Sequence, residues 1–351
     1  QLSDGNNGWS ISQQASPSPV PWSYGVGGQS PKPPAFAEAN GVLYAAVQGT
    51  NNEIYWNSSS NGGSTWSGWL QLPGGMTTDE TPALAVVNGT LYLAYLGNGN
   101  SQINITSLKL SSANNPWSSQ YQVPNQGADS ICMLNENNSL VMYYQGTNSQ
   151  LYRTSTSTPS SSSGWAENSI YYNNSSADSQ TSSGQLAATI VNGTTYLAYQ
   201  GGTTSSPSNT IYVTSSSSQS SGTSWSLISN TPQPTTAAHS GVGLTNDGTG
   251  LVLSYADQVG GSPILALQKG TVSNNTWTSA GSFSVASPGG TSSPQASLFA
   301  PTNTPGANQL LLASINGKSS PANDITTILA SPGQLLTPAQ TGSSLSPVGD
   351  L

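Results

Sequence analysis

One segment, residues 82–117, sets a pattern that the rest of the chain repeats. It contains two apolar runs, PALAVV and LYLAYL, separated by Asn88-Gly89. Asn-Gly between two such runs is a strong hairpin signal, because both central positions of a type I′ turn need a positive φ angle. Ile103 and Ile105 then alternate with polar residues in the period of two that marks a third strand, and Trp117 opens a fourth. The segment predicts a four-stranded antiparallel sheet.

The second strand of this unit recurs in six copies at a spacing of about fifty residues. The copies read VLYAAVQG from Val42, TLYLAYLG from Thr90, SLVMYYQG from Ser139, TTYLAYQG from Thr194, GLVLSYAD from Gly250 and QLLLASIN from Gln309. Five of them are followed by a tryptophan that opens the fourth strand: Trp66, Trp117, Trp165, Trp225 and Trp277. Repeats of this period, each forming one small sheet, are typical of propellers.

The sixth copy lacks this tryptophan, whereas Trp9 stands near the N-terminus without preceding strands. If residues 8–13 supply the outermost strand of the last sheet, the ring closes without an open sheet edge. We therefore predict an all-β fold, a six-bladed β-propeller of four-stranded antiparallel blades over residues 1–331, closed by the N-terminal strand in the last blade. Residues 332–351 are rich in Pro, Gly, Ser and Thr and read as a C-terminal tail.

The chain is poor in charge, with 5% charged residues, five Lys plus Arg and a net charge of −8. So few cations cannot neutralise a phosphate backbone or an anionic bilayer, so we expect neither nucleic acid nor membrane insertion. The scarcity of Lys and Arg leaves little for trypsin-like proteases to cut, which favours a secreted, extracellular or cell-surface location. Cys132 is the single cysteine, so no internal disulfide is expected, and we interpret it as a small core residue.

Residues 59–66 read SSNGGSTW, which resembles the Asp-box pattern S-x-D-x-G-x-T-W of sialidase-like propellers, with Asn61 in the aspartate position. Residues 218–225 are a weaker version with Ser220 there. The PALA-N-G-LY segments are similar to repeats of bacterial and fungal propeller proteins, lectins included. In the Asp-box (BNR-like) family this box is a structural turn away from the active site, so the resemblance implies the fold rather than an activity.

Sialidases resemble one another in three arginines that clamp the substrate carboxylate, a Tyr/Glu nucleophile pair and an acidic proton donor. This chain has one arginine, Arg153, so the clamp cannot be built and we expect no sialidase activity. We interpret Arg153 as a blade-surface cation stacked on a tyrosine.

Another glycosidase would need two carboxylates facing each other across a pocket. Asp79, Glu80 and Asp129 are the best candidates, because they precede inner strands and so lie near the mouth of the ring. Glu38 and Asp178 are weaker additions. Acidic loop residues are more often simply solvated, so we expect that the chain is not an enzyme.

No metal or cofactor is expected, because the chain has one histidine, His239, one cysteine and no calcium-loop motif. His239 could cap a loop before the fifth inner strand, and its place near the mouth makes it a candidate ligand residue. A Ser-His-Asp triad would need His239 as its base, and no G-x-S-x-G motif presents a nucleophile.

The aromatic residues divide into two groups. Tyr95, Tyr144, Tyr199 and Tyr255 share one register of the second strand, which predicts packing between blades. Trp22, Trp56 and Trp69 fall outside the repeated tryptophan position and are candidates for stacking on a sugar ring.

These observations favour a secreted, non-catalytic β-propeller that binds a glycan or a cell-surface or extracellular protein. A structural or adhesive protein that self-assembles is the alternative, and an acid-pair glycoside hydrolase is the third hypothesis. The candidate ligand residues are Trp22, Trp56, Trp69, Asp79, Glu80, Asp129 and His239.

Overall fold

The computed structural model describes residues 2–3, 10–11, 28–111, 116–171, 181–203, 205–217, 224–234, 241–259, 262–286, 296–301, 310–316 and 324–330. The regular structure of these residues is entirely β, which confirms the predicted all-β class of antiparallel sheets. Within them, no helix has the length and apolar character needed to cross a membrane.

Each of the six sequence repeats forms antiparallel strands. Repeat 1 contains β3 (Ala35–Ala39), β4 (Val42–Gln48), β5 (Ile54–Ser59) and β6 (Leu70–Gln71). Repeats 2 and 3 contain β7 (Ala83–Val87), β8 (Thr90–Leu96), β9 (Gln102–Lys109), β10 (Tyr121–Glu136), β11 (Ser139–Gly146), β12 (Leu151–Thr156) and β13 (Ala166–Ser169). Repeat 4 contains β14 (Ala187–Val191), β15 (Thr194–Thr203), β16 (Ser206–Ser216) and β17 (Ser226–Leu227). Repeat 5 contains β18 (Gly243–Asn246), β19 (Leu251–Val259), β20 (Ser262–Ser273) and β21 (Thr276–Ala286), and repeat 6 contains β22 (Ala296–Phe299), β23 (Leu310–Asn316) and β24 (Asp324–Ala330).

The long strand β10 joins repeats 2 and 3 into one seven-stranded sheet. Its first residues, Tyr121 and Gln122, pair with β9, whereas Ser130 to Glu136 pair with β11. The register shifts between these two parts. One strand is therefore the outer strand of repeat 2 and the inner strand of repeat 3.

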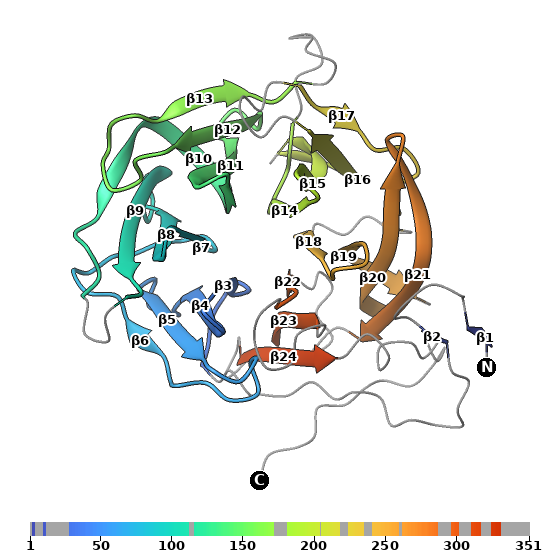
Figure 1. The fold of residues 1–351 in the computed structure, drawn as a ribbon, viewed down its shortest axis with the longest axis horizontal. Coiled ribbons are helices and arrows are strands. Elements are labelled where there is room, and N and C mark those ends of the chain that lie inside the picture. The colour runs from blue at the N-terminus through green and yellow to red at the C-terminus, as the bar shows by residue number, and fades with distance from the viewer. Residues whose placement is uncertain are drawn as a thin grey trace.

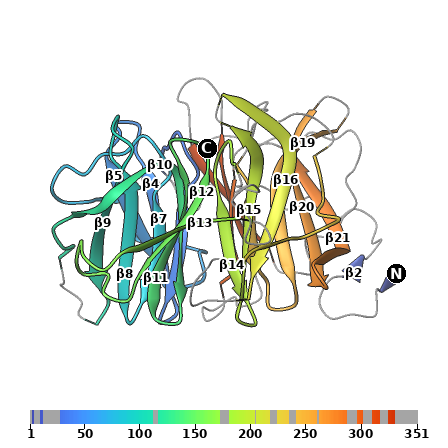
Figure 2. The same cartoon turned by 90° about the horizontal axis from the view of Figure 1, so that it is seen from above.

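The repeats follow one another around a central axis, as Figure 1 shows, and their strands run along that axis in the side view (Figure 2). The first strands β3, β7, β10, β14, β18 and β22 all line one channel on the axis. Strand β22 of the last repeat also contacts β3 of the first. This is the arrangement of a β-propeller.

The N-terminal strands are short. Strand β2 (Ser10–Ile11) pairs with β1 (Leu2–Ser3), and among the described residues repeat 6 has three strands. Trp9 and the rest of the predicted closing strand, residues 8–9 and 12–13, lie outside the described residues, as does the predicted tail. Closure by residues 8–13 therefore stays a prediction.

The turns between first and second strands have the predicted backbone. Asn40, Asn88 and Asn192 have φ angles of 52°, 49° and 49°, and the following glycines are also at positive φ. This left-handed conformation is tolerated best by Asn and Gly, which explains why Asn-Gly marks these hairpins in the sequence.

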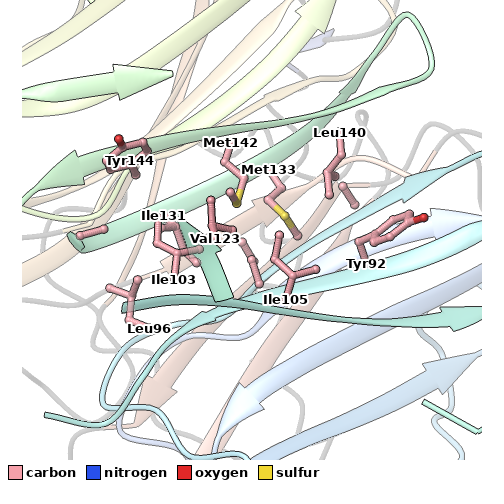
Figure 3. Close-up of a cluster of buried hydrophobic side chains, with 14 of the residues drawn as sticks. Tyr92, Leu96, Ile103, Ile105, Val123, Ile131, Met133, Leu140, Met142 and Tyr144 are labelled. Carbon is pink, nitrogen blue, oxygen red and sulfur yellow. The ribbon is translucent and has the colours of Figure 1, made fainter. Parts of the chain in front are cut away.

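The core lies between neighbouring repeats. In Figure 3, Met133, Met142 and Tyr144 of repeat 3 pack against Ile103 and Ile105 of repeat 2. The four tyrosines of the shared register are all buried, and each belongs to an apolar cluster: Tyr95, Tyr144, Tyr199 and Tyr255. The prediction that they pack between blades is confirmed.

The loop at residues 59–66 is held by its own side chains. Asn61 Oδ1 accepts a hydrogen bond from Thr65 N at 2.9 Å, and Ser59 Oγ accepts one from Gly63 N at 2.9 Å. Trp66 Nε1 donates to Gly63 O at 3.1 Å. Asn61 thus supplies a side-chain acceptor within this loop. Ser220 of the weaker copy of the pattern lies outside the described residues.

The interpretation of Arg153 as a surface cation is wrong. Its side chain is 3% exposed, and its guanidinium lies 2.9 Å from a carboxylate oxygen of Glu136. The same carboxylate accepts hydrogen bonds from Tyr143 and from Thr195 of repeat 4. Arg153 therefore lies at the junction of repeats 3 and 4, where the Glu136 carboxylate at the end of β10 is its counter-charge.

Candidate functional site

The loops that lead into the inner strands carry the predicted acidic residues. Asp79 and Glu80 precede β7, and Asp129 lies in β10 at the register shift between Ala128 and Ser130, where the pairing with β11 begins. Thr78 N donates to Asn52 O and Ala128 N donates to Ser101 O, each at 2.8 Å. Since these two bonds join each loop to the preceding repeat in the same way, Asp79 and Asp129 occupy equivalent positions in neighbouring repeats.

A buried hydroxyl holds Glu80 in place. Thr78 is fully buried, and its Oγ1 accepts from Glu80 N at 3.1 Å and donates to Glu80 O at 3.2 Å. Ser30 makes the same two bonds with Lys32 in repeat 1. The same pair of hydroxyl–backbone hydrogen bonds therefore positions Lys32 in one repeat and Glu80 in the next.

Lys32 and Glu80 form an ion pair across these two loops. Lys32 Nζ lies 2.8 Å from Glu80 Oε2, and the two side chains are 27% and 37% exposed. Asp79 Oδ2 accepts a hydrogen bond from Gly99 N at 3.1 Å. A partly exposed pair of this kind contributes roughly 0–1 kcal/mol to stability, so its main effect is to orient the two groups.

The three carboxylates form one electrostatic group. Burial raises the pKa of the Glu80 carboxyl above its ordinary value, Lys32 opposes this, and the charges of Asp79 and Asp129 raise it further. The pKa of Glu80 is therefore affected by both aspartates as well as by the lysine. We call Lys32, Asp79, Glu80 and Asp129 the mouth cluster.

The mouth cluster stands next to the axial channel. The channel has a volume of about 410 Å³, and its lining includes Thr81 and Pro82, directly after Glu80, and Gln185 at the start of repeat 4. Deeper in, the inner strands contribute both apolar residues such as Leu84 and Ile131 and polar residues such as Asn135 and Thr189. A ligand at this end would meet charged groups first and a wall of mixed polar and apolar residues behind them.

The structure brings together part of the predicted site. Asp79, Glu80 and Asp129 are grouped, and Glu38 lies on β3, farther along the channel wall. Trp22, His239 and Asp178 lie outside the described residues. Among the described residues, no three His, Cys, Asp or Glu side chains are close enough to hold a metal ion.

The two described candidate tryptophans lie on opposite faces of the sheet of repeat 1. Trp56 packs toward repeat 2, with its ring edge on Trp117 at a centroid distance of 5.6 Å. Trp69 packs toward repeat 6, in contact with Val47 and Ile325. Its indole also covers Gly28, where a Cβ would lie 2.6 Å from Trp69 Nε1. Both indoles are half-buried, and one ligand cannot stack on both.

Sequence reasoning did not identify Lys32 or the two bracing hydroxyl residues, Ser30 and Thr78. Their signal is present in the aligned loops, where Ser30-Pro31-Lys32 precedes PPAFA and Thr78-Asp79-Glu80 precedes TPALA. In both loops a hydroxyl residue stands two positions before a charged residue, and the two charges are opposite. This pattern would have predicted the ion pair.

Two tyrosine–carboxylate contacts involve buried phenols. Tyr143 donates to Glu136 and Tyr144 donates to Glu167, but Tyr143 and Tyr144 are 0% and 2% exposed. Burial raises the pKa of both phenols well above the ordinary value. Neither phenol is accessible to a substrate.

Burial likewise raises the pKa of the Cys132 thiol to about 12, which argues against a reactive thiolate.

Comparison with known proteins shows the fold. No family model and no curated protein matches the sequence. Among solved structures, the chain is similar to the Hadza microbial sialidase Hz136, with a TM-score of 0.57 and 15% identity over 86% of this chain, and it spans 65% of that protein's length. It is similar to an α-L-arabinanase from Penicillium chrysogenum complexed with arabinobiose, with a TM-score of 0.57 and 13% identity over 90% of this chain and 99% of that one. The SapL1 lectin in complex with α-methyl fucoside gives a TM-score of 0.55 and 14% identity over 87% of this chain and 95% of that one.

These similarities confirm the resemblance to sialidase-type and lectin propellers at the level of the fold. They also contradict the expectation that the chain is not an enzyme, because sialidases and an arabinanase share this fold. The expectation rested on the view that acidic loop residues are merely solvated. The mouth cluster departs from that view, since its carboxylates are grouped and the pKa of Glu80 is raised.

Proposed function

We propose that this propeller binds a glycan at the mouth cluster. The observation that carries the proposal is that three carboxylates and one lysine gather at one end of the channel, in a chain in which 5% of the residues are charged. Carboxylates accept hydrogen bonds from sugar hydroxyls, the lysine ammonium donates them, and the apolar residues of the mixed channel wall can meet the C–H face of a ring.

The fold supports this choice of ligand class. The solved structures with the same fold include proteins named for arabinobiose, α-methyl fucoside and sialidase activity. Because the identities are at most 15%, the support concerns the scaffold, and the residues of this chain must supply the rest of the argument. Arg153 is buried against Glu136, so we propose a glycan without a carboxylate.

Trp56 and Trp69 remain secondary candidates, each for a separate ligand, since they face away from each other. Trp22 and His239 stay predictions. An extracellular location, which the low Lys and Arg content favours, is part of the proposal.

Calorimetric titration with neutral oligosaccharides tests the mouth cluster. Glu80→Gln keeps the shape of the side chain but removes the charge and the ion pair, so binding should weaken at least tenfold, as expected for a charged hydrogen-bonding group worth about 1.5–3 kcal/mol. Glu167→Gln, which removes an exposed carboxylate on β13, is the matched control and should leave binding unchanged. Equal affinity in both variants would count against the site.

Glycoside hydrolysis at the same cluster is the second candidate. It is favoured by the raised pKa of Glu80 near two other carboxylates, which suits a proton donor beside an ionised partner. Release of reducing ends from arabinan and other neutral polysaccharides tests it. Glu80→Gln, Asp79→Asn and Asp129→Asn should each reduce the rate, and hydrolysis that survives all three would exclude these residues.

We also propose that the ring has six blades and that the chain before Gly28 completes the last one. Ile325 N donates to Gly28 O at 3.1 Å, as Ile54 N donates to Met76 O at 3.2 Å in repeat 1. Residues 28–30 therefore take the place in repeat 6 that residues 76–78 take in repeat 1. In repeat 1, residues 76–78 follow the outer strand β6. By the same arrangement, the chain before Gly28 would supply the outer strand of repeat 6.

A further inference from the structure

The turns between the second and third strands carry a repeated polar set. In repeat 1 it consists of Asn51, Glu53 and Tyr55, and in repeat 3 of Asn148, Gln150 and Tyr152. The members stand at positions i, i+2 and i+4 in both repeats. We call these two sets the turn clusters.

The two turn clusters have the same hydrogen bonds. Asn148 Nδ2 lies 3.2 Å from Gln150 Oε1 and 2.8 Å from the Tyr152 hydroxyl, which itself donates to Gln150 Oε1 at 3.1 Å. In repeat 1, Asn51 Nδ2 lies 2.6 Å from Glu53 Oε2 and 3.1 Å from the Tyr55 hydroxyl. Both arrangements place an amide and a phenol hydroxyl side by side at the surface.

The turn itself does not need this arrangement. In both repeats Asn Oδ1 accepts from the backbone N of the residue two positions on. Repeat 2 builds a turn on the same contact, from Gln102 N to Asn100 Oδ1 at 3.0 Å, but has Asn104 where the others have tyrosine. The tyrosine and its bonds to the Asn and Glx side chains are therefore additional to the turn.

Each tyrosine is fixed by a glycine beneath its ring. A Cβ at Gly49 would lie 2.6 Å from the Tyr55 ring, and one at Gly146 would lie 2.7 Å from the Tyr152 ring. Tyr152 also stacks on Tyr144 at a centroid distance of 5.2 Å. The rings are thus held in place while Asn51 and Asn148 are exposed and both tyrosines are half-exposed, so the polar groups are presented with little freedom left to lose on binding.

The turn clusters lie at the same end of the molecule as the mouth cluster, one in repeat 1 and the other in repeat 3. Each turn bonds to the loop that leads into the next repeat: Thr78 N to Asn52 O, and Ser182 N to Ser149 O, at 2.8 Å. Repeat 2 separates the two turn clusters around the ring (Figure 1).

We propose that the two turn clusters are equivalent sites for neutral sugars, distinct from the mouth cluster, and that together they make the protein bivalent for glycan-coated surfaces. The amide, the Glx oxygen and the phenol hydroxyl offer donors and acceptors to adjacent sugar hydroxyls. The repeat 3 cluster has no charge, and the repeat 1 cluster has only Glu53, so binding is insensitive to salt in the first and only weakly sensitive in the second.

Titration calorimetry with cellotriose, arabinotriose and methyl α-fucoside, and binding to beads coated with the same sugars, test the proposal. The variants are Gln150→Ala with Tyr152→Phe, Glu53→Ala with Tyr55→Phe, and all four changes together; the asparagines that hold the turns are left intact. Gln102→Ala in repeat 2 is the matched control, and Glu80→Gln reports on the mouth cluster.

Each double variant should remove one site from the stoichiometry, and loss of bivalency should weaken bead binding on the order of 100-fold. The fourfold variant should lose both sites, while Gln102→Ala and Glu80→Gln keep both, and all variants should retain the wild-type melting temperature within a few degrees. Unchanged stoichiometry in the fourfold variant, or wild-type protein that binds none of the three sugars, would overturn the proposal. Loss of the turn sites with an intact mouth site, or the reverse, separates this inference from the proposed function.

Discussion

Two carboxylate–cation pairs in this molecule have nearly the same length but opposite settings. The Arg153–Glu136 pair spans 2.9 Å with side chains 3% and 1% exposed, whereas the Lys32–Glu80 pair spans 2.8 Å with side chains 27% and 37% exposed. The first is enclosed between two repeats and further bonded to Tyr143 and Thr195. The second faces solvent beside a channel and two other carboxylates. Burial, rather than the contact distance, separates a charge that holds the fold from one that can meet a ligand.

Removal of one partner should give the largest difference between the pairs. Arg153→Met leaves Glu136 charged and buried, so we expect a loss of about 3–5 kcal/mol in the free energy of unfolding. Lys32→Met should cost no more than about 1 kcal/mol, because Glu80 can be hydrated. Urea unfolding of the two variants measures both values. Similar losses would mean that burial does not distinguish the two ion pairs.

The hydroxyl brace beneath Glu80 should give an intermediate effect. Thr78→Val removes the buried group that bonds to both Glu80 N and Glu80 O, so we expect a loss of about 1–2 kcal/mol together with weaker glycan binding. Thr106→Val is the control, because Thr106 is also fully buried and hydrogen-bonded, to Ser118 O, but lies on β9 away from the mouth cluster. Equal loss of binding in both variants would mean that the brace acts only through stability.

The smallest expected effect is on the pH dependence of the free energy of unfolding, to which Asp247 and Glu80 should contribute with opposite signs. Asp247 of repeat 5 pairs with Lys269 at 2.8 Å, and the two side chains are 4% and 6% exposed. Burial alone would raise the pKa of Asp247, but hydrogen bonds from Lys269 and Thr249 lower it below the ordinary value. Because the folded-state pKa of Asp247 is depressed, its ionised carboxylate stabilises the fold at pH values above the unfolded-state pKa. This contribution to the free energy of unfolding is lost as the pH falls through the folded-state pKa. The folded-state pKa of Glu80 is raised, so the native state binds more protons in that window and the Glu80 contribution becomes less favourable as the pH rises.

Unfolding free energies between pH 3 and pH 7 measure these slopes for wild type, Asp247→Asn and Glu80→Gln. The difference between wild type and Asp247→Asn should shrink toward acid, and the difference between wild type and Glu80→Gln should move in the opposite direction. Slopes of the same sign would show that the two environments are electrostatically alike.

Local sequence signals predicted the repeats well. Asn88-Gly89 and its equivalents specify turns by φ angle, and the shared register of Tyr95 and Tyr144 specifies burial by strand alternation. These are short-range rules, and the structure confirms them. The joining of repeats 2 and 3 through β10 was not predicted, because nothing in residues 121–136 marks one continuous strand rather than two.

Contacts between repeats were harder to predict. Lys32 and Glu80 are 48 residues apart, and the curvature of the ring sets their distance rather than any local pattern. Arg153 is buried because Glu136 ends a different strand of the same repeat and Thr195 reaches it from the next one. The grouping of Asp79, Glu80 and Asp129 was predicted from their shared place before inner strands, whereas Trp56 and Trp69, close in sequence, were separated by the two faces of one sheet.

We propose that the exposed Lys32–Glu80 pair belongs to the ligand site, whereas the buried Arg153–Glu136 pair belongs to the scaffold. The most direct test is the ligand-induced rise in melting temperature for wild type and for the double variant Lys32→Met with Glu80→Gln, titrated with an oligosaccharide that the wild type binds. We expect the double variant to melt within about 3 °C of wild type without ligand and to lose most of the ligand-induced rise. A double variant that melts normally and keeps the full rise would contradict the assignment of the mouth cluster as the glycan site.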